Sequence, residues 1–252
     1  MTQEYTNIHA AVIDSWVANG WEWGKPIDHE TYERALAGDW FVLLTPTKPV
    51  PKEWFGDLRG KRLLGLASGG GQQIPIFNAC GARCTVLDYS QKQLESERVV
   101  AEREGYDITV VRADMTKPLP FHDGAFDLIF HPVSNCYVHE VLPIWRECYR
   151  VLVPGGILLA GLDNGLNFAF DEEHGCALRY TLPFDPLANE DQRRDLEEAD
   201  DGMQFSHTIE EQIGGQLEAG FRLTHVYGDT NGVGPLHEHH VPTFWATRAV
   251  RP

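Results

Sequence analysis

The stretch Leu63-Leu64-Gly65-Leu66-Ala67-Ser68-Gly69-Gly70-Gly71 decides the fold class of this sequence. Its first half is a short apolar run, typical of a buried strand, and its second half is a turn of small residues. A segment with helical spacing then reaches Cys80, and Pro75 is compatible with that helix only in its first turn. The N-terminus of such a helix is expected to offer free backbone N–H groups to a ligand.

The alternation of strand and helix continues along the chain. Apolar or β-branched runs at 84–88, 108–111, 126–130 and 157–162 predict further strands. A helix is predicted over about 141–152, and the runs at 221–227 and 242–248 predict two closing strands. Ser90 and Gly105 are placed to cap a helix between them. We therefore expect an α/β fold with a doubly wound, mostly parallel sheet covered on both faces.

Acidic residues follow two of the predicted strands directly. Asp88 ends the second strand and Asp114 follows the third. Ligands of open α/β sheets bind at the carboxyl ends of the strands, where a carboxylate is placed to accept hydrogen bonds from ribose hydroxyls. The glycines together with these two carboxylates predict a nucleoside-containing cofactor.

In these segments the sequence resembles the class I S-adenosylmethionine-dependent methyltransferases. The matching stretches are 63–71, 85–90, 112–115, 126–129 and 150–156. The resemblance implies a Rossmann-like, seven-stranded sheet with an antiparallel last strand, S-adenosyl-L-methionine as cofactor, and a small-molecule methyl acceptor. The sequence departs from the family at two positions. Gly65 stands where an acidic residue is usual, and Ala67 stands where the first glycine of the turn is usual.

The resemblance also implies which residues contact the cofactor. The glycine turn would wrap the methionine part, Asp88 would hold the ribose, and Asp114 with the Met115 backbone would meet the adenine. The full predicted set is Ala67, Ser68, Gly69, Gly70, Gly71, Asp88, Tyr89, Asp114, Met115 and His131.

Two other functions are weighed against this one. A nicotinamide-dependent Rossmann oxidoreductase would need a glycine at the position of Ile74 to complete its GxGxxG fingerprint, and that glycine is absent. A non-catalytic cofactor-binding or sensor domain is compatible with the same motifs, and cofactor turnover would separate it from an enzyme.

The candidate catalytic residues follow the fourth strand. His131 is a candidate general base because an unperturbed imidazole titrates near pH 6.5, and the alternative is a structural histidine bonded to a backbone carbonyl. Asn135 and Tyr137 are candidates to orient the substrate or the cofactor, although Tyr137 equally fits the core. Asp163 and Asn164 follow the fifth strand and fit either a substrate contact or an Asx turn.

Two further clusters of residues are interpreted as structural rather than functional. His237-Glu238-His239-His240 is interpreted as a surface loop rather than a metal site, because adjacent residues of a strand alternate between faces. No metal ion is predicted. Trp21 and Trp23 either line an apolar pocket or, as favoured here, belong to the core that docks the N-terminal segment.

The chain divides by composition into three parts. Residues 1–55 hold five of the seven tryptophans and a Pro-rich connector, and we expect them to cap the pocket. Residues 56–252 form the cofactor-binding domain. Within that domain, residues 164–205 are expected to be a loop-rich, lid-like insertion, and its acidic run from 189 to 201 is expected to be solvated surface.

Net charge and composition limit the classes of partner that the protein is expected to bind. The chain has 252 residues and a net charge of −16, which argues against broad binding to nucleic acids or to anionic membranes. The N-terminal residues lack the features of a signal peptide, no apolar run is long enough to span a membrane, and the five cysteines show no paired spacing. We therefore expect a cytoplasmic protein; its oligomeric state is unknown.

Overall fold

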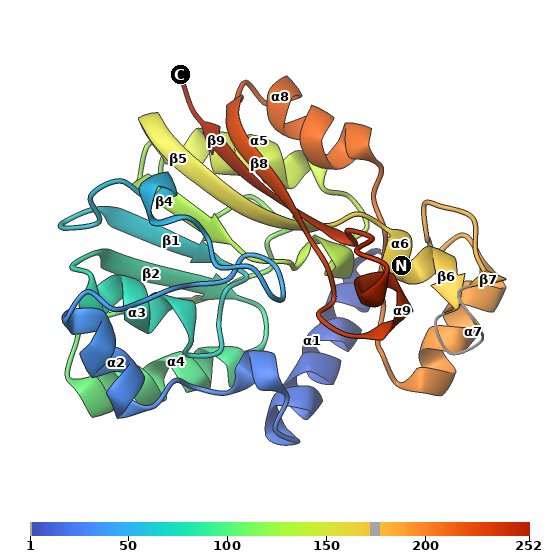
Figure 1. Cartoon of the computed structure of the whole chain (residues 1–252), viewed down its shortest axis with the longest axis horizontal. Helices are drawn as coiled ribbons and strands as arrows, with labels where there is room; N and C mark the ends of the chain where they lie inside the picture. The colour runs from blue at the N-terminus through green and yellow to red at the C-terminus, as the bar shows by residue number, and fades with distance from the viewer. Residues whose placement is uncertain (1, 172–176) are drawn as a thin grey trace.

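The predicted strands pair into one twisted sheet in the computed structural model, which describes residues 2–171 and 177–252 (Figure 1). Its seven strands lie in the order β3-β2-β1-β4-β5-β9-β8. Their bounds are β1 Arg62–Leu66, β2 Arg83–Asp88, β3 Thr109–Arg112, β4 Phe126–His131, β5 Leu152–Asp163, β8 Arg222–Asp229 and β9 Phe244–Val250. The strands from β3 to β5 pair in parallel, and β9 runs antiparallel to both of its neighbours. The predicted doubly wound fold is confirmed.

Helices cover both faces of the sheet. The α-helices are α1 Thr2–Ala18, α2 His29–Leu36, α3 Gln73–Ala79, α4 Gln91–Glu104, α5 Leu142–Val151, α6 Leu166–Ala169, α7 Glu190–Ala199, α8 Gly215–Glu218 and α9 Gly234–Glu238. Short 3₁₀ turns occur at η1 Glu22–Gly24, η2 Lys52–Trp54 and η3 Asn135–Tyr137, and a π-helical turn, η4 Glu210–Gly214, precedes α8. The small hairpin β6 Phe170–Asp171 and β7 Ala177–Leu178 stands apart from the main sheet. Figure 1 shows α2, α3 and α4 on one face and α5 and α8 on the other.

The capping residues act as the sequence predicts. The Ser90 hydroxyl accepts a hydrogen bond from the Gln93 N–H at the start of α4, and Gly105 ends this helix with a φ angle of 72°. Thr208 and Glu211 form a reciprocal capping box, in which each side chain accepts a hydrogen bond from the other residue's N–H. The helix that follows is not uniform, because it passes through the π-helical turn before α8.

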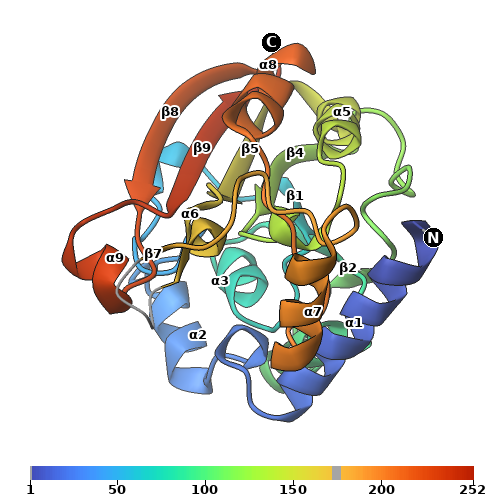
Figure 2. The same cartoon turned by 90° about the vertical axis from the view of Figure 1, so that its right-hand side faces the viewer.

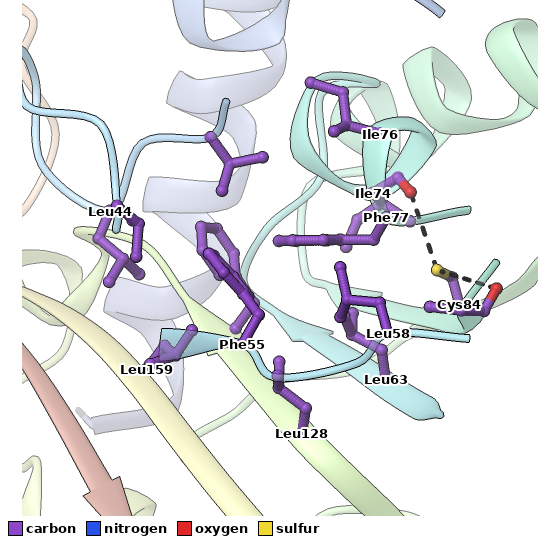
Figure 3. Packing of buried hydrophobic residues seen from close by; sticks show 14 of the residues in the cluster. Leu44, Phe55, Leu58, Leu63, Ile74, Ile76, Phe77, Cys84, Leu128 and Leu159 are labelled. Carbon is purple, nitrogen blue, oxygen red and sulfur yellow. Dashed lines mark hydrogen bonds between the residues drawn. The ribbon is translucent and has the colours of Figure 1, made fainter. Parts of the chain in front are cut away.

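The core is built on strand side chains that alternate between the two faces. Leu63 packs in the cluster under α3, and its neighbour Leu64 packs in the cluster under α5. The first cluster also takes in Leu44 and Phe55, which are 1% and 0% exposed (Figure 3). The segment around Leu44 therefore lies against the sheet itself: a Cβ added at Gly161 of β5 would be 2.0 Å from the Leu44 carbonyl oxygen.

The insertion carries more regular structure than the sequence suggests. The short elements α6 and α7 and the β6–β7 hairpin lie within 164–205, and loops connect them. The acidic run at 189–201 forms α7, capped by Asn189, and buries Gln192 and Leu196 among its exposed carboxylates. A single buried apolar side chain is too weak a periodic signal to predict a helix. Cys176 lies outside the described residues, and the division at residues 55 and 164–205 stays a prediction.

Figure 2 looks onto the carboxyl ends of the parallel strands, with α1 and α7 in front of them. The N-terminal segment and the insertion thus meet at the edge where the candidate ligand residues end their strands. No helix in the ranges 2–171 and 177–252 is long and apolar enough to cross a membrane.

Candidate functional site

The turn after β1 needs its glycines for steric reasons. Gly70 and Gly71 have φ angles of 105° and 70°, in the region that disfavours residues with a Cβ. A Cβ added at Gly69 would lie 2.7 Å from the Gln93 Cβ, and one added at Gly70 would lie 2.4 Å from the Trp23 carbonyl oxygen. The turn is therefore pressed between α4 and the N-terminal segment.

The backbone N–H groups of this turn are already bonded within the protein. Gly69 donates to the Asp88 carboxylate at 3.0 Å, Gly70 to the Gln93 carbonyl at 3.0 Å, and Gly71 to the Glu97 carboxylate at 2.8 Å. The acceptors come from β2 and α4, so these three glycine amides are not available to a ligand. The turn is held rigid by these bonds, as a ligand cradle requires.

Two side-chain atoms beside the turn have no partner. The Ser68 hydroxyl and the Gln93 amide oxygen are buried, make no hydrogen bond in the described structure, and belong to residues that line the large cavity. A buried polar atom left unbonded costs about 1–3 kcal/mol, so these atoms suit a polar ligand. Together with the glycine cradle, they fit the amino-acid end of the predicted cofactor.

The N-terminal segment is hydrogen bonded to the outer side of this turn. The Ile27 N–H donates to the Gly71 carbonyl at 2.9 Å, and the Gln72 side-chain amide donates to two carbonyls of the segment. Trp21 and Trp23 line the cavity, half-buried, so they contribute to the pocket rather than only to docking of the segment.

Asp88 connects two cavities. Its carboxylate oxygens accept hydrogen bonds from the Gly69 and Ser90 N–H groups, both at 3.0 Å, and the residue lines both the large cavity and a smaller neighbour. Burial raises the pKa of Asp88 to about 6, while the backbone N–H donors oppose that rise. Each carboxylate oxygen keeps a further lone pair, which suits the hydroxyls of a ribose.

The small cavity has an apolar floor fit for a planar base. Ala113 and Met115 follow β3 and line it, as does Tyr89 after β2. Asp114 instead accepts a hydrogen bond from the Thr116 N–H at 2.8 Å and lies outside the residues that line this cavity. The structure thus brings Ala67, Asp88, Tyr89 and Met115 together around one cavity, with Asp114 beside it.

The large cavity has a volume of about 1010 Å³ and extends from the glycine turn to the insertion. Asp163, at the end of β5, lines it and accepts hydrogen bonds from the Gly165 N–H and the Asn167 side chain, both at 2.6 Å. Burial raises the pKa of Asp163 to about 6. Asp163 therefore makes the Asx turn and faces the cavity as well, whereas the Asn164 side chain bonds backbone groups.

The sequence did not indicate the cavity residues that come from the insertion. Arg179 and Tyr180 line the cavity, and both hydrogen bond to Asp195 of α7. The wall also includes eight other aromatic side chains: Trp16, Trp21, Trp23, Tyr137, Phe168, Phe170, Phe184 and Phe244. The sequence indicated only Trp21, Trp23 and Tyr137 as candidates, since the other residues come from separate segments that only the tertiary fold brings together.

His131 and Asn135 lie behind the cavity wall. His131 is 0% exposed; its Nδ1 lies 2.8 Å from the Leu66 carbonyl oxygen, and its Nε2 lies 2.8 Å from the Asn135 side-chain oxygen. Asn135 in turn donates to Gln212 at 3.0 Å. Neither His131 nor Asn135 is among the residues that line the cavity, whereas Tyr137 is. Burial lowers the pKa of His131, while the hydrogen bonds to the Leu66 carbonyl and the Asn135 side chain oppose that shift.

The position where the family usually has an acid is filled by another side chain. A Cβ at Gly65 would lie 2.3 Å from the Ile74 Cδ1, so Ile74 occupies the space that a carboxylate would need. The cluster at 237–240 lies at the end of α9, where His237 pairs with the Thr230 hydroxyl at 2.7 Å. Within the described ranges, no group of three or more His, Cys, Asp or Glu side chains could hold a metal ion.

The mostly parallel sheet in this strand order, with β9 antiparallel between β5 and β8, a glycine turn after β1 and a carboxylate after β2, is the arrangement that the resemblance to class I methyltransferases implies. The family described as "Methyltransferase domain" matches residues 64–160. The chain is also 41% identical, over 244 residues, to the uncharacterized methyltransferase YbaJ of Bacillus subtilis (strain 168). The alignment covers 94% of this chain and 95% of that relative. The chain belongs to the methyltransferase family.

Solved structures share this fold at low sequence identity. An S-adenosylmethionine-dependent methyltransferase from Mesorhizobium loti has a TM-score of 0.63 and 22% identity, over 79% of this chain and 95% of that one. The geranyl diphosphate C-methyltransferase of Streptomyces coelicolor A3(2) has a TM-score of 0.62 and 15% identity, over 99% of this chain and 98% of that one. The second was solved in complex with Mg²⁺, geranyl diphosphate and S-adenosyl-L-homocysteine. The predicted family and fold are confirmed, and the oxidoreductase alternative is not favoured.

Proposed function

We propose that this chain transfers a methyl group from S-adenosyl-L-methionine to a small-molecule acceptor. The observation that carries the proposal is Asp88, a buried carboxylate at the end of β2 that lines both the large cavity and the small one. A nucleoside bound there has its ribose at Asp88 and its base against Met115. The amino-acid end of the cofactor then reaches Ser68 and Gln93, whose side chains hold polar atoms with no hydrogen-bond partner in the described structure.

The residues of the chain mainly orient the reactants. When bound, the cofactor supplies an electrophilic methyl group, which the lone pair of the acceptor takes as the carbon–sulfur bond breaks. Holding two reactants in line lowers such a barrier by roughly 7–11 kcal/mol. Tyr137 faces the cavity and is the candidate to orient the acceptor, while His131 and Asn135 are proposed to position the η3 turn that carries Tyr137.

The lining of the large cavity favours an uncharged or cationic acceptor. Its aromatic wall is accompanied by the carboxylates of Asp163 and Asp201, and the nearby Arg179 is already paired with Asp195. Burial, with a smaller contribution from the Asp200 charge, raises the pKa of Asp201. Aromatic faces and carboxylates both attract cations, whereas an anionic acceptor would meet like charge.

A panel of small amines, phenols, thiols and carboxylic acids tests this function. The measured quantity is S-adenosyl-L-homocysteine released per mole of enzyme, with Asp88→Ala as the matched control. Turnover with an amine or a phenol, lost in the control, supports the proposal. Cofactor binding without turnover on any acceptor class would favour a non-catalytic sensor instead.

We place the enzyme in the cytoplasm, in keeping with the free Cys80, Cys84, Cys136 and Cys148.

A further inference from the structure

Helix α1 closes the small cavity opposite Asp88. Thr6, His9, Ala10 and Ile13 lie on one side of this helix and line the cavity, because residues three and four apart share a helix face. The opposite wall is the cofactor wall described above, which includes Asp88. The proposed nucleoside site is thus completed by the N-terminal helix.

This helix is anchored at both of its ends. The Asp14 carboxylate accepts hydrogen bonds from the Ser90 hydroxyl at 2.5 Å and from the Lys92 N–H at 3.0 Å. Nearer its start, the Tyr5 hydroxyl accepts a hydrogen bond from the His139 N–H at 3.1 Å. These bonds fix which side chains of α1 face the cavity.

The polar groups on the inner face of α1 have no partner in the described structure. The Thr6 hydroxyl and both ring nitrogens of His9 are buried and make no hydrogen bond, and the two residues are 7% and 4% exposed. More than nine in ten buried polar groups in proteins are bonded, so three such atoms on one helix face call for an explanation.

The surroundings of His9 are aromatic rather than polar. Its ring stacks on Tyr137 with centroids 4.1 Å apart and meets the edge of Trp16 at 6.0 Å. On another side, a Cβ added at Gly202 would lie 2.8 Å from the His9 Nδ1. Burial lowers the pKa of His9 to about 3, so the ring is neutral and offers one donor and one acceptor.

We propose that Thr6 and His9 bind the adenosine part of the cofactor through hydrogen bonds supplied by α1. The inference rests on the proposed function, since it assigns new residues to the same site. A nucleoside offers hydroxyl and amino donors as well as ring-nitrogen acceptors, which match a hydroxyl and a neutral imidazole. Helix α1 is then part of cofactor recognition rather than only a cover.

The test uses substitutions that remove hydrogen bonding while keeping shape. In the full chain, Thr6→Val and His9→Phe should leave the ligand-free melting temperature unchanged or raise it, because each removes an unbonded buried polar atom. The same variants should weaken S-adenosyl-L-homocysteine binding by about 3- to 10-fold each, measured by calorimetry. Thr109→Val, the same change at an exposed residue of β3, is the control and should alter neither quantity.

The possible outcomes are distinguishable. Unchanged affinity in a more stable variant would overturn the inference and leave the proposed function intact. Failure of the unaltered chain to bind S-adenosyl-L-homocysteine would overturn the proposed function itself. If His9→Phe fails to fold, His9→Leu, which also lacks a donor and an acceptor, replaces it. A loss of affinity of about 3-fold or more in His9→Leu supports the role of His9, and a smaller loss contradicts it.

Discussion

The Asp88 carboxylate holds backbone groups in place and also lies at the proposed cofactor site. Its oxygens accept the Gly69 and Ser90 N–H groups, which fixes the glycine turn relative to the end of β2. The same side chain lines both cavities. A substitution there is therefore expected to affect stability as well as cofactor binding.

We expect Asp88→Ala to weaken S-adenosyl-L-homocysteine binding by about 1.5–3 kcal/mol, which is a roughly 10- to 150-fold rise in the dissociation constant. The reason is the loss of a charged acceptor for the ribose hydroxyls. The ligand-free melting temperature should also fall, because two backbone N–H groups lose their acceptor. Titration calorimetry and thermal unfolding measure both effects, with the exposed Asp107→Ala as control. An unchanged dissociation constant would show that the ribose lies elsewhere.

His131 is expected to act through structure rather than as a base. We predict that His131→Ala lowers the free energy of unfolding by about 1–3 kcal/mol, because the Leu66 carbonyl and the Asn135 side chain lose their partner. Turnover per folded molecule should fall less than 10-fold. Denaturant unfolding and rates normalised to folded protein test this. A stable variant that is 10²- to 10⁴-fold slower would restore the role of general base.

The sequence predicts where a site residue lies only when its distance along the chain from a recognisable strand fixes its position. Asp88 follows a β-type run by position, so its place at the strand end was predictable. The environment of His131 was not, because the Leu66 carbonyl and Asn135 come from β1 and η3. Thr6 and His9 carry no motif, and only the docking of α1 reveals their unbonded atoms.

At the scale of elements, the glycine turn is tied to α4 by a buried carboxyl group. Glu97 is 0% exposed and accepts the Gly71 N–H at 2.8 Å. Burial, with a smaller contribution from the Asp88 charge, raises the pKa of Glu97 to about 8. The folded chain therefore holds this proton to higher pH than the unfolded chain, whose glutamate titrates near 4.5.

This difference predicts a pH dependence of stability. The contribution of Glu97 is fully present below about pH 4.5 and is lost as the pH rises toward 8. Glu97→Gln keeps an oxygen for the Gly71 N–H and cannot ionise. Its advantage over the unaltered chain should be small at pH 5 and on the order of 1–3 kcal/mol at pH 8. Urea unfolding at the two pH values measures it, and an equal difference at both would contradict the assignment.

The two parts of the N-terminal segment should respond differently to deletion. Removing residues 1–18 takes away α1, and the sheet should still fold while S-adenosyl-L-homocysteine affinity falls at least 10-fold. Removing residues 1–45 also deletes Val42 and Leu44, both 1% exposed in the core, and should prevent stable folding. Near-ultraviolet circular dichroism and calorimetry separate the two. Unchanged affinity without α1 would show that the helix is not part of the site.

Strands and long capped helices were predictable because their signals are local. Helix α4 has its Ser90 cap and its Gly105 end in the sequence, and the structure confirms both. Helix α7 was missed, since its buried face consists of Gln192 and Leu196 in a run of charges. The π-helical turn η4 was missed too, because no residue pattern distinguishes it from an α-helix.

At the scale of the whole molecule, individual residues could be predicted for the proposed cofactor half of the site. For the proposed acceptor half, only the segments could be predicted, as the cap at 1–55 and the insertion at 164–205. The cofactor half follows from strand ends, whose place in a parallel sheet is set by topology. The acceptor half needs α1, the segment around Trp21 and the insertion to converge on one cavity of about 1010 Å³. Such long-range convergence depends on side-chain packing that no single stretch of sequence encodes.

Titration calorimetry of the full chain with S-adenosyl-L-homocysteine, and in parallel with NADH, tests the central claim most directly. The cradle at Gly69–Gly71, the carboxylate of Asp88 and the side chain of Ile74 in place of a glycine all predict saturable, one-to-one binding of S-adenosyl-L-homocysteine. NADH should give no binding heat under the same conditions. Saturable binding of NADH, with none of S-adenosyl-L-homocysteine, would contradict the account.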